Sequence, residues 1–357
     1  MNRLRAWPAL ILACLASACV SPDKPATRAP VFIPAPKPRP LPPVSDNRSA
    51  ATPAMLQSLR AISASFDGVL GIAVSRTDGA VIFSYRADLF FPQQSVSKLW
   101  VALAIFDAID SGRITLDQKV TITRADLTLF HQPIAGLVGE AGYETNVSEL
   151  LLRAMTQSDN TANDSLLRTV GGPEVVRRML DRKGITGVRF GNGERALQSA
   201  TAGLTWQQSY SRGNAFYTAR AGLPDSVRRE ALDRYLTTLP DGAQPQAIVR
   251  ALGRLQSGDL LSPGSTRLLL SLMNEAKTGK LRVAGGVPAG WRYGHKTGTG
   301  QEFAGLSTGY NDVGIMTAPD GTSYAIAVMI ATTRRPIAER QVMMQGISAA
   351  IAANHRR

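Results

Sequence analysis

Cysteine and histidine are scarce in this 357-residue chain, and their positions exclude several kinds of site. The two cysteines, Cys14 and Cys19, both lie near the N-terminus. The rest of the chain therefore holds no disulfide and no thiolate metal site. The three histidines are scattered, and neither H-x-x-E-H nor H-E-x-x-H, the zinc-binding spacings of many hydrolases, occurs. We expect no metal and no cofactor.

Aromatic residues are also few, at 6% of the chain, whereas basic residues give it a net charge of +13 at pH 7. A groove for single-stranded nucleic acid needs aromatic side chains set among the basic ones, and the sequence shows no such interleaving. We therefore expect no nucleic-acid partner. The positive charge instead favours contact with anionic surfaces of the cell envelope.

The N-terminus has the pattern of an export signal. Arg3 and Arg5 form a basic segment, and residues 9–16 form an apolar run too short to span a bilayer. Small residues precede Cys19, which resembles the lipidated cysteine of a bacterial lipoprotein signal. We expect residues 1–18 to be removed and Cys19 to anchor the protein to a membrane facing the periplasm. The alternative is ordinary cleavage before Cys19, which would give a soluble periplasmic protein.

Residues 19–54 are dominated by proline, alanine and basic residues. Such a composition cannot bury a core, and it predicts a disordered, extended tether. The remaining residues, 55–357, are long for one domain but suit a mixed α/β enzyme. Within them, residues 204–240 predict an inserted helical hairpin.

Hydrophobic patterns predict strands at both ends of this domain and helices between them. The expected strands cover residues 69–74, 81–85, 309–317 and 324–331. The first two flank a turn and predict a β-hairpin, and a last helix is expected over residues 337–353. The fold class is therefore α/β (α+β), with one antiparallel sheet built from both termini beside a mainly helical subdomain.

Three short motifs, far apart in the chain, carry groups suited to acyl transfer. They are Ser95-Val-Ser-Lys98, Ser158-Asp159-Asn160 and Lys296-Thr297-Gly298. A single S-x-x-K occurs by chance in many chains of this size. The ordered set, and not any one motif, therefore indicates function.

The first motif places a hydroxyl beside an amine. The segment after Ser95 is helix-prone, so Ser95 and Lys98 share one helix face. A serine hydroxyl is a poor nucleophile at neutral pH and needs an adjacent base, and N–H groups at the helix start favour a developing oxyanion. Alternatively, Ser95 only caps the helix and Lys98 is solvated.

The other two motifs predict a proton relay and a binding edge. Ser158 and Asn160 stand just before a helical segment, where they either cap the helix or supply a relay hydroxyl and an amide contact. Lys296 to Gly298 predict a strand edge. There Lys296 offers positive charge, Thr297 a hydroxyl for a carboxylate, and Gly298 room for substrate to lie alongside.

In this order the motifs resemble those of the class A serine β-lactamases, and the resemblance covers most of the chain from Leu56 onward. It implies that Ser95 is the acylated nucleophile, Lys98 its activator and Ser158 the proton relay. The oxyanion hole would be the backbone N–H groups of Ser95 and Thr299.

The same resemblance implies a set of substrate contacts. The residues are Asn160, Lys296, Thr297, Gly298, Thr299 and Arg282. Arg282 matches a place where some family members carry an arginine facing the substrate carboxylate. Arg334 and Arg335 are alternatives for that role.

Glu194 corresponds, by this resemblance, to the glutamate of an Ω-shaped loop that holds the water for hydrolysis of the acyl-enzyme. The short motif alone is equally consistent with an exposed loop carboxylate, but its distance after Ser158 favours the catalytic role. The sequence departs from the family pattern at two nearby positions. Gln198 stands where asparagine usually helps to hold the water, and Asn192 where arginine often pins the loop.

The leading functional hypothesis is hydrolysis of small-molecule β-lactams by a monomeric enzyme. A D-alanyl-D-alanine carboxypeptidase or related peptidoglycan hydrolase, acting on stem peptides, is the second. An envelope lipoprotein that binds β-lactams with slow turnover is the third. Glu194 favours the first hypothesis, because a peptidase needs no dedicated deacylating carboxylate on that loop.

Overall fold

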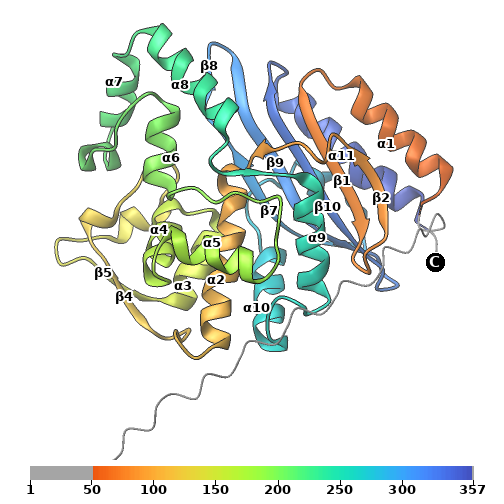
Figure 1. Cartoon of the computed structure of the whole chain (residues 1–357), viewed down its shortest axis with the longest axis horizontal. Coiled ribbons are helices and arrows are strands. Elements are labelled where there is room, and N and C mark those ends of the chain that lie inside the picture. Colours follow the sequence, from red (N-terminus) through yellow and green to blue (C-terminus); the bar gives the residue numbers. More distant parts are fainter. Residues whose placement is uncertain (1–50, 356–357) are drawn as a thin grey trace, which may run out of the picture. The chain divides into compact units, whose positions relative to one another are not determined.

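The computed structural model describes residues 51–355 of the chain (Figure 1). The predicted signal segment, Cys19 and nearly all of the predicted tether lie outside these residues. The folded domain begins slightly earlier than predicted, because helix α1 (Pro53–Ser65) already includes residues 53 and 54. Proline suits the first helical position, and the Thr52 side chain caps the helix by accepting a hydrogen bond from the Met55 N–H at 3.0 Å.

A six-stranded antiparallel sheet forms one part of the domain (Figure 1). Its strands are β1 (Val69–Arg76), β2 (Val81–Tyr85), β7 (Arg292–Thr299), β8 (Glu302–Phe303), β9 (Leu306–Thr317) and β10 (Ser323–Thr333). The order is β2-β1-β10-β9-β7, with β8 pairing to β9. The first and last segments of the domain thus meet at the β1–β10 pair. The predicted hairpin and the sheet built from both termini are confirmed.

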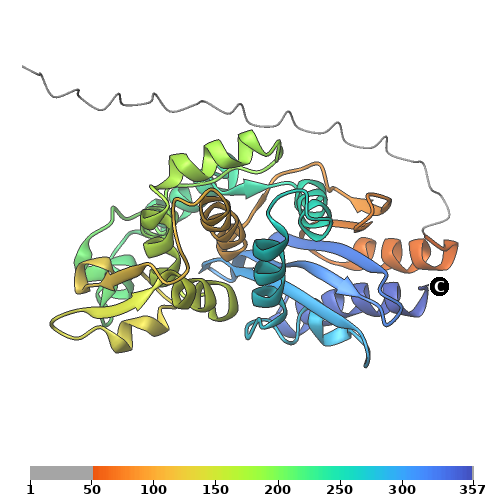
Figure 2. The same ribbon diagram turned by 90° about the horizontal axis from the view of Figure 1, so that it is seen from below.

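Helices cover both faces of this sheet (Figure 2). Helices α1 and α11 (Ile337–Ala353) pack on one face, where Ile72 of β1 and Ile347 of α11 belong to the same buried cluster. Helix α9 (Pro245–Gln256) packs on the other, where Leu252 and Ala327 of β10 share a second buried cluster. Alternate residues of a strand point to opposite faces, so both faces are apolar and both are covered.

The rest of the domain is mainly helical and surrounds helix α2 (Lys98–Asp110). Its other helices are α3 (Val147–Leu152), α4 (Asn160–Thr169), α5 (Pro173–Arg182), α6 (Glu194–Thr201), α7 (Ala215–Ala221), α8 (Asp225–Thr238) and α10 (Pro263–Asn274). Two short strand pairs complete it: β3 (Phe91–Pro92) with β6 (Gly242–Ala243), and β4 (Lys119–Ile122) with β5 (Tyr143–Asn146). Helix α2 is apolar on nearly all sides, as expected of a helix buried in a core.

Helices α7 and α8 occupy the segment predicted as a helical hairpin. Ala231, Leu232 and Tyr235 form the buried face of α8, so the predicted helical character is confirmed. That the segment is an insertion remains a prediction. No helix in residues 51–355 is both long enough and apolar enough to cross a membrane.

The edge strand β7 lies against the start of α2, and a glycine makes this approach possible. A Cβ atom on Gly298 would lie 2.3 Å from the Gln93 carbonyl oxygen, which is a severe clash. The Asn311 side chain joins the same two segments from β9, because its Nδ2 donates to the carbonyls of Pro92 and Gln93 at 2.7 and 3.0 Å. The third motif is thereby held beside the first.

Candidate active site

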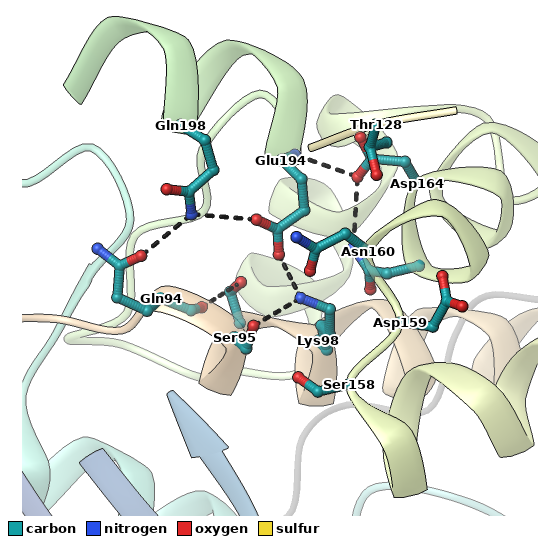
Figure 3. Close-up of polar contacts among 12 residues, drawn as sticks. Gln94, Ser95, Lys98, Thr128, Ser158, Asp159, Asn160, Asp164, Glu194 and Gln198 are labelled. Atoms are coloured by element: carbon teal, nitrogen blue, oxygen red, sulfur yellow. Dashed lines mark hydrogen bonds and ion pairs between the residues drawn. The ribbon is translucent and has the colours of Figure 1, made fainter. Parts of the chain in front are cut away.

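Ser95 and Lys98 lie together at the junction of a short 3₁₀ helix (Gln94–Ser97) and α2. Lys98 Nζ donates a hydrogen bond to Ser95 Oγ at 2.8 Å, so the predicted shared face is confirmed (Figure 3). Ser95 is half-buried and lines a cavity, whereas the Lys98 side chain is fully buried. The alternative of a solvated lysine is therefore wrong.

Glu194 is buried beside Lys98, with only 4% of its surface exposed. Lys98 Nζ contacts Glu194 Oε1 as well as Ser95 Oγ, which forms a buried ion pair (Figure 3). The alternative of an exposed loop carboxylate is wrong. Glu194 is the first residue of helix α6. Asp164 Oδ1 accepts the Glu194 N–H at 3.1 Å and so satisfies a backbone group that the helix leaves free.

Gln198 contacts the second oxygen of Glu194 from the next turn of α6. Its Nε2 donates to Glu194 Oε2 at 3.2 Å and to Gln94 Oε1 at 3.1 Å (Figure 3). Asn192, where the family often has arginine, instead accepts a bond from Arg177 Nη2 at 3.2 Å. Arg177 also donates to the Phe190 carbonyl at 2.6 Å, so an arginine from α5 holds the segment before α6.

A buried carboxylate that the sequence analysis missed supports the residue before the nucleophile. Asp241 accepts the Gln94 N–H at 2.8 Å and the Tyr235 hydroxyl at 3.0 Å. Gln94 has φ of 53°, a left-handed conformation that costs energy in any residue with a Cβ, and its Nε2 donates to Tyr235 Oη at 2.6 Å. Burial raises the pKa of Asp241 to about 6. The contacts to Asp241 thus hold a strained backbone next to Ser95.

Burial and the neighbouring charge of Glu194 also raise the pKa of Asp164 to about 6. Asp164, Asp241 and Glu194 are thus three buried carboxyl groups, of which Glu194 contacts Lys98, Asp164 contacts Glu194 and Asp241 contacts Gln94. Among the residues described by the structure, no group of three or more His, Cys, Asp or Glu side chains is arranged to hold a metal ion.

The second motif divides into a cap and two cavity-lining residues. Asp159 caps α4, because its Oδ1 accepts the Ala162 N–H at 2.9 Å. Ser158 has φ of 62°, and its Oγ accepts a hydrogen bond from Lys296 Nζ at 2.9 Å. Asn160 Nδ2 donates one hydrogen bond, to the Leu129 carbonyl at 2.8 Å. Its second N–H has no partner among the described residues. The capping alternative thus holds for Asp159 but not for Ser158.

The third motif lies on β7, as predicted. Lys296 is 1% exposed, and its pKa is well below the usual value, first because of burial and then because of the positive charges of Lys98 and Arg282. The hydroxyl of Thr297 is hydrogen-bonded to that of Thr278 at 2.8 Å. Thr278 also lines the cavity and carries no recognisable motif.

Arg282 is fixed behind the same strand. It donates to the Gly298 carbonyl at 2.8 Å and to Thr299 Oγ1 at 2.5 Å, and it stacks over the Tyr310 ring at 3.8 Å. Burial lowers its pKa. The two alternatives lie elsewhere: Arg334 donates to the Ala304 carbonyl, and Arg335 pairs with Asp67. Of the three arginines, only Arg282 lines the cavity.

These residues surround a cavity of about 400 Å³. The predicted residues in its wall are Ser95, Ser158, Asn160, Thr297, Thr299 and Arg282. Gly300, just after the third motif, also lines the cavity. Wall residues that sequence reasoning missed are Phe130, His131, Arg220, Thr278 and Gln301. No local pattern marks the missed group, because its members come together only through the fold. Lys98, Glu194 and Lys296 lie behind this wall and contact Ser95 or Ser158, or one another.

Comparisons with known proteins agree with this arrangement. The β-lactamase enzyme family matches residues 54–354. A β-lactamase from Streptomyces fradiae is 30% identical over 278 residues, which cover 77% of each protein. The VEB-1 β-lactamase of Pseudomonas aeruginosa is 26% identical over 266 residues, or 74% of this chain and 78% of that protein.

The fold is shared with solved structures as well. The crystal structure of a β-lactamase from Chitinophaga pinensis matches with a TM-score of 0.69 and 28% identity, covering 84% of this chain and 98% of that chain. An ancestral class A β-lactamase matches with a TM-score of 0.64 and 26% identity, covering 84% of this chain and 99% of that chain. The chain therefore belongs to the β-lactamase enzyme family, as a class A serine β-lactamase.

Proposed function

We propose that Ser95 attacks the β-lactam carbonyl and that a water activated by Glu194 releases the ring-opened product. The observation that carries this proposal is the Lys98 amine, which contacts both Ser95 Oγ and the buried Glu194 carboxylate. The Lys98 amine takes the proton that leaves the Ser95 hydroxyl, and the Glu194 carboxylate beside it stabilises the ammonium group that forms. This arrangement supplies the adjacent base that a serine nucleophile requires.

In the acylation step, the oxygen of Ser95 bonds to the lactam carbonyl carbon and the carbon–nitrogen bond of the ring breaks. The start of the helix and the end of β7 both reach the cavity at Ser95 and Thr299. Their backbone N–H groups are suited to stabilise the oxyanion. Ser158 protonates the leaving nitrogen, because Lys296 already donates to its oxygen and leaves the hydroxyl hydrogen for the substrate. The proton that Lys98 took from Ser95 then replaces the one that Ser158 lost, so the amine is neutral and Glu194 is still ionised when deacylation begins.

The ring carboxylate of the substrate binds at the end of the cavity formed by Thr297 and Arg282. The Thr297 hydroxyl lines the cavity there, with Arg282 beside it and Lys296 behind it. Positive charge in a partly water-free site favours an anionic group strongly. Asn160 also lines the cavity, where its free N–H can donate to the acylamino carbonyl of the substrate.

In the deacylation step, Glu194 takes a proton from water, the water oxygen bonds to the ester carbon, and the bond to Ser95 Oγ breaks. The proton then returns to Ser95, which completes the cycle. Gln198 donates to Glu194 Oε2 and lines the cavity, so it is placed to orient this water.

The β-lactamases among the relatives support hydrolysis over the peptidase and the slow-turnover binding protein. Steady-state hydrolysis of a chromogenic cephalosporin by the purified protein tests this choice. Turnover of many substrate molecules per enzyme supports the hydrolase. A single burst equal to the enzyme concentration contradicts it and favours the binding protein, and cleavage of D-Ala-D-Ala peptides alone favours the peptidase.

We also infer that the enzyme works in the periplasm, as a monomer anchored through lipid on Cys19. The support is the signal-like pattern before that cysteine. The substitution Cys19→Ser should move the protein from the membrane fraction to the soluble fraction of cells. An unchanged distribution would instead favour ordinary cleavage.

A further inference from the structure

Arg220 stands at the end of the cavity away from the proposed ring-carboxylate site. It belongs to helix α7 and lines the cavity together with Gln301 and Gln198. Arg220 Nη1 donates to Gln301 Oε1 at 3.0 Å, and Gln301 Nε2 donates to the Gln198 carbonyl at 2.8 Å. These two bonds hold the guanidinium at the cavity wall.

The direction of β7 tells which part of a substrate reaches this end. Thr297, where the ring carboxylate binds, comes first, and Gln301 follows four residues later, just beyond the end of the strand. At roughly 3.3 Å per residue, this separates the two ends of the cavity by about 13 Å. A β-lactam carries its ring carboxylate and its acylamino side chain at opposite ends of the bicyclic ring. With the carbonyl at Ser95, the side chain therefore extends toward Gln301 and Arg220.

The charge of Arg220 has no acidic partner in the part of the chain that the structure describes: none of the ion pairs there includes it. By contrast, Lys98 is paired with Glu194. An acid on β8, Glu302, is exposed and lines a smaller adjoining hollow with Arg220 and Arg228. The rings of Phe216 and Tyr217 lie 5.5 and 5.4 Å from the guanidinium, so aromatic faces flank it.

An unpaired guanidinium in a cavity wall is a favourable partner for a substrate carboxylate, since it can form charge-assisted hydrogen bonds. Partial burial strengthens the attraction between Arg220 and a carboxylate, because less water screens the charge. Burial and the nearby charge of Arg228 also lower the pKa of Arg220. The Gln301 contact uses one of the five N–H groups of the guanidinium, so others are free to bind a ligand.

We propose that Arg220 gives this enzyme a preference for β-lactams whose acylamino side chain carries a carboxylate. This inference rests on the proposed function and adds a substrate class to it. The substrate is then bound as a dianion, with the ring carboxylate at Thr297 and Arg282 and the side-chain carboxylate at Arg220.

Two pairs of substrates test the proposal. Carbenicillin is benzylpenicillin with one added carboxylate on the side-chain carbon. Ceftazidime has an oxyimino group that ends in a carboxylate, whereas that of cefotaxime ends in a methyl group. For each pair, the ratio of kcat/KM for the carboxylated member to that for the neutral member is measured in the wild type and in variants. Comparing ratios between proteins cancels the other differences within a pair.

The substitution Arg220→Gln should lower this ratio by about three- to tenfold in at least one pair, the range of a partly exposed, charge-assisted contact. Arg220→Lys keeps the charge and should retain a higher ratio than Arg220→Gln. The control is Arg228→Gln, which removes the same charge from α8 at a residue outside the cavity wall, and it should leave the ratio unchanged.

An unchanged ratio in both pairs for Arg220→Gln overturns the proposal. An equal fall in Arg228→Gln also overturns it, because the effect would then be general electrostatic attraction. These failures are distinct from a failure of the proposed function, in which the wild type would hydrolyse none of the four compounds.

Discussion

The substitution Glu194→Gln separates the two chemical steps, because it keeps the shape of the side chain and removes the base. Acylation uses Ser95, the Lys98 amine and the oxyanion donors, whereas release of the product needs activated water. A positioned general base contributes roughly a hundred- to ten-thousand-fold. We therefore expect deacylation to slow by about that factor, which makes it rate-limiting.

The structure also predicts a cost for this substitution. Lys98 and Glu194 form a buried pair, and removal of one partner from such a pair costs about 3–5 kcal/mol when the other charge stays in place. The Lys98 amine can still donate to the carbonyl oxygen of the new amide as well as to Ser95 Oγ, which offsets part of this cost. The NH2 group of the new glutamine would then face Gln198 Nε2. Because both groups are donors, one hydrogen bond worth about 1 kcal/mol is lost. The variant should therefore fold with reduced stability and still acylate.

Stopped-flow mixing with a chromogenic cephalosporin measures this directly. The variant should release one product per active site in a burst and then turn over slowly, at roughly a hundredth of the wild-type rate or less. Asp164→Asn is the matched control, because it removes the charge of a neighbouring buried carboxyl group and keeps the side-chain oxygen that accepts the Glu194 N–H. Turnover of Glu194→Gln at the wild-type rate, or an equal burst in Asp164→Asn, would refute the assignment of Glu194 as the base.

Two further predictions concern the nucleophile and the carboxyl group behind it. Ser95→Ala should abolish both turnover and covalent labelling by penicillin while circular dichroism stays unchanged, and an undiminished adduct by intact-protein mass spectrometry would show that Ser95 is misassigned. Asp241 has its pKa raised from 3.8 to about 6 by burial, so the folded protein binds its proton more tightly than the unfolded chain and loses stability as pH rises from about 4 through 6. Asp241→Asn removes this dependence. The free energy of unfolding of the variant minus that of the wild type should therefore increase by about 3 kcal/mol between about pH 4 and pH 7, as measured by urea denaturation. If this difference in the free energy of unfolding stays constant with pH, the pKa of Asp241 is not raised in the folded protein.

The parts of the fold that sequence predicts well are those set by local pattern. The last helix is predicted over residues 337–353 and has those bounds, because apolar residues recur along it and a proline directly precedes it. The second strand likewise matches at 81–85. The contact of Ser95 with Lys98 follows from helical spacing alone.

The parts that sequence does not predict depend on contacts between distant segments. Asp241 supports Gln94 from a position 147 residues away, and Arg220 reaches Gln301 across 81 residues. Neither Asp241 nor Arg220 lies in a motif, and each is an ordinary surface residue by type. The sequence does not predict that a helix begins at Glu194, because that start depends on Asp164, a partner in another helix.

Trapping the acyl-enzyme on Ser95 shows directly whether this serine is the nucleophile. The Glu194→Gln variant is treated with benzylpenicillin, digested, and mapped by tandem mass spectrometry. We predict a single penicilloyl adduct on the peptide that contains Ser95, at close to one per protein. An adduct on another residue, or no adduct while the wild type still hydrolyses the drug, would show that Ser95 is not the nucleophile.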